Sequence, residues 1–223
     1  MVVITLGTGS LGNCYIVKAD NGKSIILDCG LPFREITKDK NFPKFDDIEL
    51  VFCSHSHKDH SKSLEDFKRS GVNYLSWEDK QKVYYQYGQF IVMLFPLAHN
   101  VDNCGIIITD TTNNEKLCYA TDFYKIPKIE GIDTWLYEIN FDSKTVEKLI
   151  EKNELNAHLR NALKSHNSLE SAKEYFAQIK TKPKKIIFCH LSTCHCDKRK
   201  ILKFGKTICD NVSIAQKGET NWK

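Results

Sequence analysis

The stretch Ser54-His55-Ser56-His57-Lys58-Asp59-His60 decides how this sequence is interpreted. It follows an apolar run, residues 49–53, that is typical of a β-strand. Three histidines and one aspartate fall between positions 55 and 60. Imidazole and carboxylate groups at such close spacing can converge from a tight turn onto one or two metal ions. The sequence therefore predicts a metal site at the end of this strand.

Length and composition favour one globular domain. The chain has 223 residues, of which 41% are hydrophobic, so it can bury a sizeable core. A single domain spanning residues 1–223 is the simplest interpretation. The formal net charge of +4 is mild. It permits an anionic substrate, but the strongly basic composition of many nucleic-acid-binding proteins is missing.

Cysteine usage and hydropathy indicate a cytoplasmic protein. The nine cysteines are an odd number and are scattered through apolar runs and turns. The first residues do not show the basic region and apolar stretch of a signal peptide. No apolar run approaches the ~20 residues that span a bilayer. We therefore expect reduced thiols, a cytoplasmic location and no membrane association.

The hydrophobic pattern predicts two strand-rich layers with helices outside them. Strand patterns occur at residues 2–6, 14–17, 24–27, 49–53, 90–96, 105–109, 117–120, 135–139 and 185–189. A short helix is expected around residues 64–68, and the periodicity of residues 142–180 is helical. Asn167 and Glu170 look like a capping pair for the last of these helices.

Four more polar residues, each after an apolar strand, could join the histidine cluster. They are Asp28, His99, Asp122 and His190. Strand ends in a sandwich collect along one edge, so residues distant in the sequence can meet there. Any one of the four could be an ordinary polar loop residue. Together with the cluster they favour a shared metal site.

The order and context of these residues resemble the motifs of the metallo-β-lactamase superfamily over nearly the whole chain. The resemblance implies an α/β fold, an αββα sandwich of two mixed β-sheets with helices on the outer faces. It also implies a two-metal site at one edge. One metal would be held by His55, His57 and His99, and the other by Asp59, His60 and His190. Asp122 would bridge the two metals, and Asp28 would orient the ligands.

Two divalent ions in such a site favour hydrolysis. Ions about 3.5–4 Å apart can share a water, lower its pKa, hold it as hydroxide and polarise a substrate oxygen. Asp59 could also accept a proton from this nucleophile. Mixed imidazole and carboxylate ligands favour Zn²⁺, while Mn²⁺ or Fe²⁺ are also compatible. We therefore expect a metal-dependent hydrolase.

Four further segments narrow the resemblance to one subgroup. They are Gly9-Ser10-Leu11-Gly12-Asn13, Glu138-Ile139-Asn140-Phe141-Asp142, His166-Asn167-Ser168-Leu169-Glu170 and His190-Leu191-Ser192. Similar segments occur in small bacterial and phage metallo-hydrolases that resemble a 5′-to-3′ DNA exonuclease associated with a cell-wall two-component regulator. The resemblance implies a phosphodiesterase or nuclease with a DNA or RNA substrate. The largely helical residues 123–189 leave no room for the large inserted domain with which other superfamily nucleases grip nucleic acid.

Three residues of these segments are candidate contacts to substrate. We expect His166 to bind the scissile phosphate or to protonate the leaving oxygen as a general acid. The alternative is that His166 begins a helix and contacts only its neighbours. Asn140 and Asp142 could organise the same edge, or form a strand-end turn with an aspartate helix cap.

Other clusters have two interpretations each. The lysines and arginine of residues 182–185 and 198–206 could contact phosphates, or form a solvated face. Cys194-His195-Cys196 could bind a third metal, although its spacing fits structural zinc sites poorly and a loop with partly buried thiols is favoured. Tyr84, Tyr85 and Tyr87 could stack on bases, but an amphipathic helix beside the site is favoured.

Two other functions remain open at this point. The same metal pair could hydrolyse a small molecule such as a thioester, a lactone or a cyclic nucleotide. The fold could also serve as a non-catalytic metal-binding protein. Loss of ligands would favour that second alternative, yet every expected ligand is present. The sequence does not select an oligomeric state.

Overall fold

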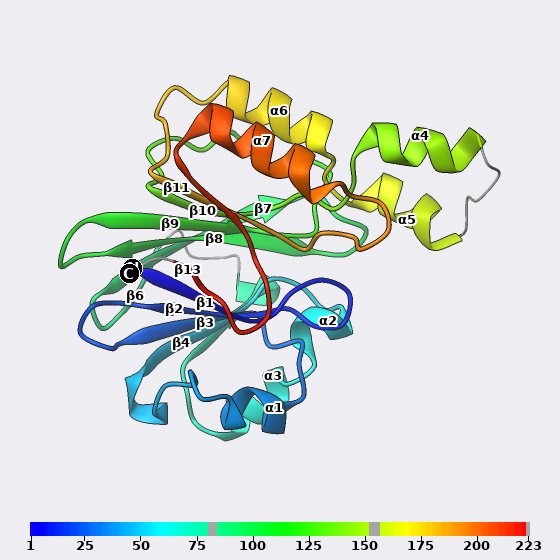
Figure 1. The fold of residues 1–223 in the computed structure, drawn as a ribbon. Helices are drawn as coiled ribbons and strands as arrows, with labels where there is room; N and C mark the ends of the chain where they lie inside the picture. Colours follow the sequence, from blue (N-terminus) through cyan, green and yellow to red (C-terminus); the bar gives the residue numbers. More distant parts are fainter. Residues whose placement is uncertain (80–83, 152–156, 222–223) are drawn as a thin grey trace.

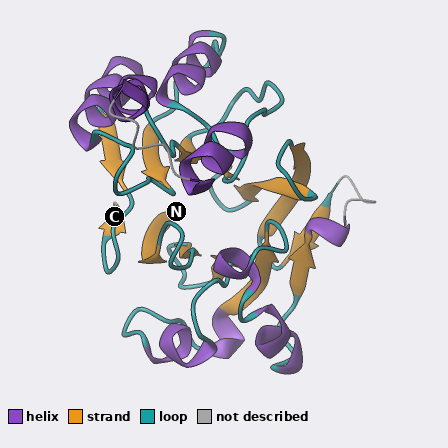
Figure 2. Ribbon diagram, turned by 90° about the vertical axis from the view of Figure 1, so that its right-hand side faces the viewer, coloured by secondary structure: helices purple, strands orange, loops and turns teal. Residues whose placement is uncertain are grey.

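Two β-sheets packed face to face form the centre of the structure, and helices cover their outer sides (Figure 1). The computed structural model describes residues 1–79, 84–151 and 157–221. Figure 2 views the molecule from the right-hand side of Figure 1 and shows strands between an upper and a lower group of helices. The predicted αββα sandwich is confirmed.

The first sheet is mixed and, within the described residues, six-stranded. Its strand order is β13 (Thr220–Asn221), β1 (Val2–Gly7), β2 (Cys14–Lys18), β3 (Ser24–Leu27), β4 (Ile48–Cys53) and β5 (Tyr74–Ser76). Strands β1 to β3 pair antiparallel, whereas β3, β4 and β5 are parallel. The outer face packs against α1 (Phe33–Lys38) and α3 (Leu64–Arg69), and the short helix α2 (Lys58–Ser61) lies at one end of the sheet (Figure 1).

The second sheet is also mixed and has seven strands in the described part of the chain. Its order is β12 (Asn211–Ile214), β11 (Lys185–Cys189), β10 (Thr134–Glu138), β9 (Glu115–Ala120), β8 (Asn103–Asp110), β7 (Phe90–Leu97) and β6 (Tyr85–Tyr87). Strands β9 to β12 are parallel, and β6 to β9 pair antiparallel. Its outer face packs against α6 (Leu169–Ala177) and α7 (Lys198–Ile208). Helices α4 (Ser143–Glu151) and α5 (Ala157–Ser165) project to the right in Figure 1.

Apolar side chains fill the space between the sheets and the space under the helices on each side. The layer between the sheets contains Tyr15, Phe52, Tyr119 and Leu136, none of which is exposed. Because both faces of each sheet are covered, its central strands are apolar on both sides. All of β3 is buried for this reason. This explains why the strands appear in the sequence as continuous apolar runs.

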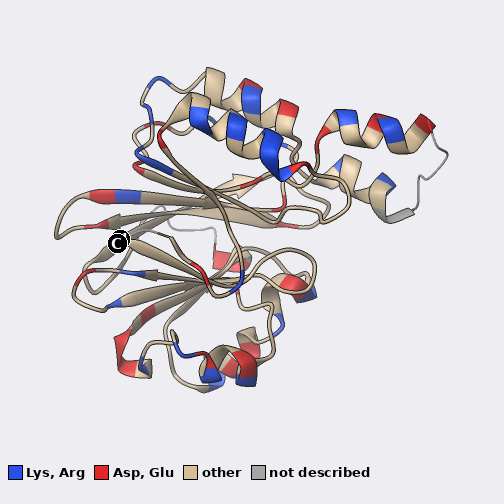
Figure 3. Cartoon of the chain, in the orientation of Figure 1, with Lys and Arg blue, Asp and Glu red and all other residues tan. Residues whose placement is uncertain are grey.

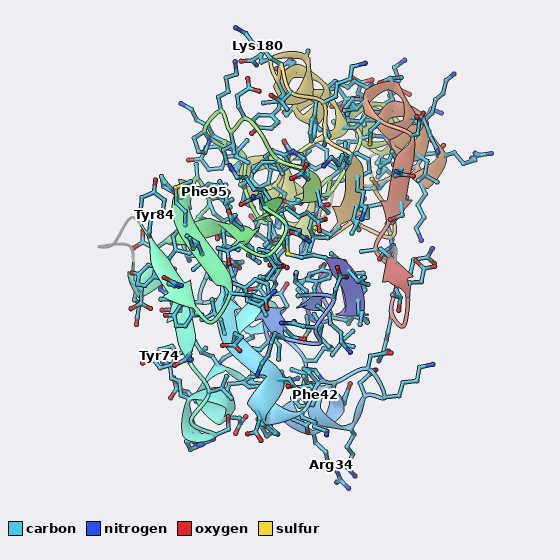
Figure 4. All side chains as sticks on the ribbon, turned by 90° about the vertical axis from the view of Figure 1, so that its left-hand side faces the viewer. Arg34, Phe42, Tyr74, Tyr84, Phe95 and Lys180 are labelled. Atoms are coloured by element: carbon cyan, nitrogen blue, oxygen red, sulfur yellow. The ribbon has the colours of Figure 1, made fainter. Side chains whose placement is uncertain are left out.

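The helix predicted around Tyr84, Tyr85 and Tyr87 is wrong. Tyr85–Tyr87 forms strand β6 and pairs antiparallel with β7. Tyr85 and Tyr87 lie on the same side of the strand with their rings stacked, which is the period of two of a strand. Tyr84 lies beside Phe95 (Figure 4), and the two line a pocket on the outer face of the second sheet.

The predicted capping pair of α6 is also wrong in its residues. Ser168 is the N-cap, and its hydroxyl accepts a hydrogen bond from the backbone N–H of Ser171. Asn167 instead donates through its amide to the carbonyl oxygen of Glu138, and Glu170 accepts from Ser143 at the start of α4. Asn167 therefore connects the start of α6 to the end of β10, and Glu170 connects α6 to the start of α4.

Candidate metal centre

Strand direction brings the predicted metal ligands to one edge of the sandwich. The parallel strands β3 and β4 end just before Asp28 and His55. In the second sheet, β9 and β11 run in one direction and end before Asp122 and His190. Strand β7 also runs in this direction, because both β7 and β9 are antiparallel to β8, and it ends before His99.

Three of these residues turn the chain sharply at the strand end. Asp28, Asp122 and His190 have backbone φ angles of 57°, 52° and 53°. Residues other than glycine rarely adopt this left-handed conformation, and such strain is concentrated at functional sites. It persists here because buried contacts hold each side chain in the cluster.

One group of ligand atoms comes from His55, His57, His99 and Asp122. His57 Nδ1 lies 3.1 Å from His55 Nε2 and 3.4 Å from His99 Nε2. Asp122 Oδ2 lies 3.7 Å from His55 Nε2 and 3.9 Å from His99 Nε2. Ligand atoms about 2.0–2.1 Å from a tetrahedral zinc ion are about 3.3 Å apart. The spacing in this group therefore suits one ion.

A second group comes from Asp59, His60, Asp122 and His190. Asp122 Oδ1 lies 3.4 Å from His60 Nε2 and 3.5 Å from His190 Nε2. Asp59 Oδ2 lies 3.5 Å and 3.6 Å from the same two nitrogens. Asp122 thus presents one carboxylate oxygen to each group, which is the arrangement of a carboxylate that bridges two ions.

An unpaired atom supports the fit to metal. His190 Nε2 is buried and has no hydrogen-bond partner in the described part of the chain. Leaving a buried polar atom unpaired costs free energy. A cation between His190, Asp59 and Asp122 would remove that cost. The donor set and its spacing therefore fit a dinuclear metal site.

Each imidazole that presents Nε2 to the centre has Nδ1 held by another group. His55 Nδ1 contacts Ser54 Oγ at 3.0 Å, and His99 Nδ1 donates to the carbonyl oxygen of Ser165 at 2.9 Å. His60 Nδ1 contacts Asp28 Oδ2 at 2.6 Å. His190 Nδ1 lies 3.4 Å from Glu138 Oε1. Such contacts fix the ring orientation and the tautomer of metal-binding histidines.

Burial and charge set different protonation states within the centre. Burial, together with the neighbouring His60 imidazole, lowers the pKa of His55 to about 2, so this ring is neutral and ready to bind metal. Burial also opposes the charged form of His190, but Asp122 and Glu138 raise the pKa of His190 to about 10. Metal binding through His190 must therefore release a proton.

Glu138, for which the sequence suggested no individual role, lies at the centre of the contacts around His166. Its side chain is fully buried at the end of β10. Glu138 Oε1 lies 2.6 Å from His166 Nδ1, and Oε2 accepts a hydrogen bond from the backbone N–H of Phe123. The His166 and His190 rings are stacked, with centroids 5.3 Å apart. Two signals were present in the sequence: a lone carboxylate at the end of an apolar strand, and its place at the start of the segment 138–142 that resembles the hydrolase subgroup.

Asn140 and Asp142 lie in different surroundings. Asn140 contacts the centre, because its Nδ2 is 3.2 Å from His190 Nδ1. Asp142 forms the N-cap of α4, accepting from the backbone N–H of Thr145, and pairs with Lys200 at 2.7 Å. It also accepts from the backbone N–H of Asp197, before α7. Asp142 therefore ties α4 to the start of α7.

We expect Asp142→Ala to lower the free energy of unfolding by about 1–3 kcal/mol, because the variant loses a helix cap and a buried partner of Lys200. The metal content is expected to stay unchanged. Lys200 and the hydrogen bonds lower the pKa of Asp142 against the effect of burial. The difference in free energy of unfolding between wild type and Asp142→Asn should therefore shrink as the pH falls below 3.8, the ordinary pKa of an aspartate. Denaturant unfolding and elemental analysis provide the two measurements, and loss of metal from Asp142→Ala would contradict a purely structural role.

Gly30 allows helix α2, which carries Asp59 and His60, to pack against the end of β3. A Cβ atom at Gly30 would lie 1.7 Å from the Asp59 carbonyl oxygen and 2.8 Å from the His60 nitrogen. We expect Gly30→Ala to displace this helix, to lower the free energy of unfolding by about 3 kcal/mol and to weaken metal binding. Thermal unfolding and metal titration test this.

Gly131→Ala is the control for Gly30→Ala. Its added Cβ meets no atom within 4 Å, although φ is 74°. This variant is expected to cost about 1–2 kcal/mol of backbone strain and to bind metal normally. Equal metal binding in both variants would argue against the role given to Gly30.

The other clusters contribute no side chain to the two ligand groups. No candidate metal group of the described residues includes Cys194, His195 or Cys196, and Cys196 Sγ contacts the carbonyl oxygen of Ile139 at 3.8 Å. Basic residues line the outer surface of α7 (Figure 3). Lysines 182, 200 and 203 border a groove of about 720 Å³ between α6 and α7. None of the helices in the described part of the chain has the length and apolar character needed to cross a bilayer.

An αββα sandwich with adjoining imidazole and carboxylate groups at one edge defines a class of metal-dependent hydrolases. The chain belongs to the metallo-β-lactamase superfamily, whose family model matches residues 7–147. That match includes Asp28, His55, His99 and Asp122.

Solved structures share this fold at low sequence identity. The metallo-β-lactamase fold protein YhfI from Bacillus subtilis matches with a TM-score of 0.70 and 18% identity, over 100% of this chain and 99% of that chain. The short form of human tRNase Z matches with a TM-score of 0.64 and 14% identity, over 99% and 98% of the two chains. Yeast PDE1 gives a TM-score of 0.64 and 12% identity, over 100% and 99%. A search of curated proteins finds no match.

Proposed function

We propose that this protein, acting as a single domain of residues 1–223, is a phosphodiesterase that cleaves DNA or RNA. The observation that carries the proposal is the position of Asp122, whose two carboxylate oxygens face two separate groups of histidine nitrogens. His55, His57 and His99 would hold one ion, and Asp59, His60 and His190 the other, with Zn²⁺ the first choice and Mn²⁺ or Fe²⁺ as alternatives. When bound, such an ion pair would supply an activated water and neutralise charge on a phosphoryl group.

The chain's own residues would position the substrate and move protons. Asp59 is partly exposed, unlike the buried Asp122, so its carboxylate can accept a proton from an attacking water. His166 stands beside the centre, with its Nδ1 held by the Glu138 carboxylate at 2.6 Å. The carboxylate keeps His166 oriented and raises the pKa of its imidazole despite burial. A protonated His166 can donate to the leaving oxygen.

Two further observations support a nucleic-acid substrate. Structures with the same fold include proteins named tRNase Z and RNase Z. The segments that resemble the exonuclease subgroup also lie at the centre, since Asn13 Nδ2 is 3.0 Å from His60 Nε2 and Asn140 contacts His190. We therefore favour exonuclease-like cleavage. No disulfide joins any of the nine cysteines, all of which lie in the described part of the chain, and this supports a cytoplasmic location.

The test is an incubation of protein loaded with Zn²⁺ or Mn²⁺ with end-labelled DNA and RNA, alongside a thioester and a lactone. We expect cleavage of at least one nucleic acid, with product length reporting the polarity. Labels at the 5′ and 3′ ends of single-stranded and duplex substrates separate exonuclease from endonuclease products. Hydrolysis of only the thioester or lactone would replace the proposal with a small-molecule hydrolase. Absence of bound metal would favour a non-catalytic protein.

A further inference from the structure

A hydrogen bond between the two sheets ends at the metal centre. Tyr119 lies on β9 of the second sheet, and its side chain is fully buried in the layer between the sheets. Its hydroxyl donates to Asp28 Oδ2 at 2.5 Å. Asp28 follows β3 of the first sheet. The bond therefore joins two strands that belong to different sheets.

Asp28 passes this restraint to a metal-facing histidine. Its Oδ2 atom contacts His60 Nδ1 at 2.6 Å and accepts from Ser54 Oγ at 3.0 Å, while Oδ1 accepts from the Ser54 backbone N–H at 2.8 Å. The opposite nitrogen of the same ring, His60 Nε2, faces Asp122 Oδ1 and Asp59 Oδ2. The orientation of Asp28 thus sets the direction of a ligand atom.

We propose that Tyr119 is a positioning residue for the ion held by Asp59, His60, Asp122 and His190. Its hydroxyl fixes Asp28, which fixes His60. The same strand, β9, ends just before Asp122. It therefore positions the bridging carboxylate of Asp122 directly and, through Tyr119, the Asp28 carboxylate that contacts His60. The ion held by His55, His57 and His99 is linked to Asp28 less directly, through Ser54, whose Oγ lies 3.0 Å from both Asp28 Oδ2 and His55 Nδ1, so we expect it to be affected less. This inference rests on the proposed metal centre and adds a residue to it.

The test is Tyr119→Phe, which removes one oxygen atom. Metal-free protein is titrated with Zn²⁺ in competition with a chelating dye, which resolves the two equivalents. Removing an outer partner of a metal-binding histidine typically weakens affinity by about 10–100-fold. We expect the affinity for one equivalent of Zn²⁺ to fall about tenfold and the affinity for the other to change less than twofold. Equal weakening of both equivalents, or no weakening, would overturn the inference.

Tyr137→Phe is the matched control. Tyr137 lies on the adjacent strand β10 and is equally buried, and its hydroxyl has no hydrogen-bond partner in the described part of the chain. The Tyr137→Phe variant is expected to bind both equivalents of Zn²⁺ with wild-type affinity. A loss as large as that of Tyr119→Phe would show that both variants act through general loosening of the core, and would overturn the inference.

A double-mutant cycle tests whether Tyr119 acts through Asp28. Asp28→Asn is expected to weaken the same equivalent, and adding Tyr119→Phe is expected to cause no further loss. Additive losses would contradict the route through Asp28. If Tyr119→Phe does not fold, Asp28→Asn decides alone, and wild-type affinity there would overturn the inference. If wild type binds two zinc equivalents but the variants do not show the expected losses, the metal centre stands and the role of Tyr119 is wrong. If wild type does not bind two equivalents, the proposed metal centre and the role of Tyr119 are both wrong.

Discussion

Asp122→Asn is expected to abolish most hydrolysis and to lower the metal content from two equivalents per chain to one or none. Asp122 is the one side chain shared by the two ligand groups, so its loss affects both. An amide is a poorer ligand than a carboxylate and does not neutralise the ions. Losing several kcal/mol of transition-state stabilisation corresponds to a rate decrease of about 10³-fold or more. Elemental analysis and the rate of nucleic-acid cleavage provide the measurements.

Asp20→Asn serves as the control for Asp122→Asn. Asp20 is exposed in the turn between β2 and β3, and the substitution makes the same change of charge. Wild-type metal content and rate are expected for this variant. Two full equivalents of metal in Asp122→Asn would show that Asp122 does not bridge the ions, whatever its effect on the rate.

His166→Ala is expected to slow cleavage of DNA or RNA by about 10²–10⁴-fold, the usual contribution of a general acid. The same variant should hydrolyse bis(4-nitrophenyl) phosphate at a rate within about tenfold of wild type. Nitrophenolate is a stable anion and leaves without a proton, whereas a sugar alkoxide needs one. The ratio of the two rates therefore separates proton donation from damage to the metal centre.

Two companion variants sharpen this test. Glu138→Gln removes the carboxylate that holds His166 Nδ1, and it should reduce nucleic-acid cleavage in the same selective way. His195→Ala removes another loop histidine, whose Nδ1 contacts Ser192 Oγ, and it should leave both rates unchanged. If His166→Ala slows both substrates equally, His166 supports the centre and does not donate a proton.

Local sequence patterns were sufficient for the central strands β1 to β4 and β7 to β11 and for the residues that gather at their ends, but they missed the shorter strands β5, β6, β12 and β13. Buried strands are continuous apolar runs, and a polar residue directly after such a run is visible without any knowledge of the fold. The basic run at the start of α7 concealed a helix, although Ile201, Phe204 and Ile208 have helical spacing and pack against the second sheet. The charges lie on the exposed face of an amphipathic helix, and they obscured the helical spacing of its apolar residues.

The roles of Tyr119 and Glu138 could not be predicted in the same way. Tyr119 and Asp28 are separated by 91 positions, and Glu138 and His166 by 28. Each pair meets only because the sheets stack or because α5 returns the chain to the end of β10. Within β9, Tyr119 looks like an ordinary core aromatic residue. Such contacts depend on tertiary packing, which local periodicity does not report.

The left-handed backbone at Asp28, Asp122 and His190 affects how any mutational scan of this protein should be designed. Alanine has a Cβ atom and no side chain able to form a local hydrogen bond, so at these positions an alanine variant combines lost chemistry with a relaxed backbone. Asparagine tolerates the same conformation. Asparagine scanning is therefore the cleaner measure of side-chain function here, and alanine values at these positions will overstate it.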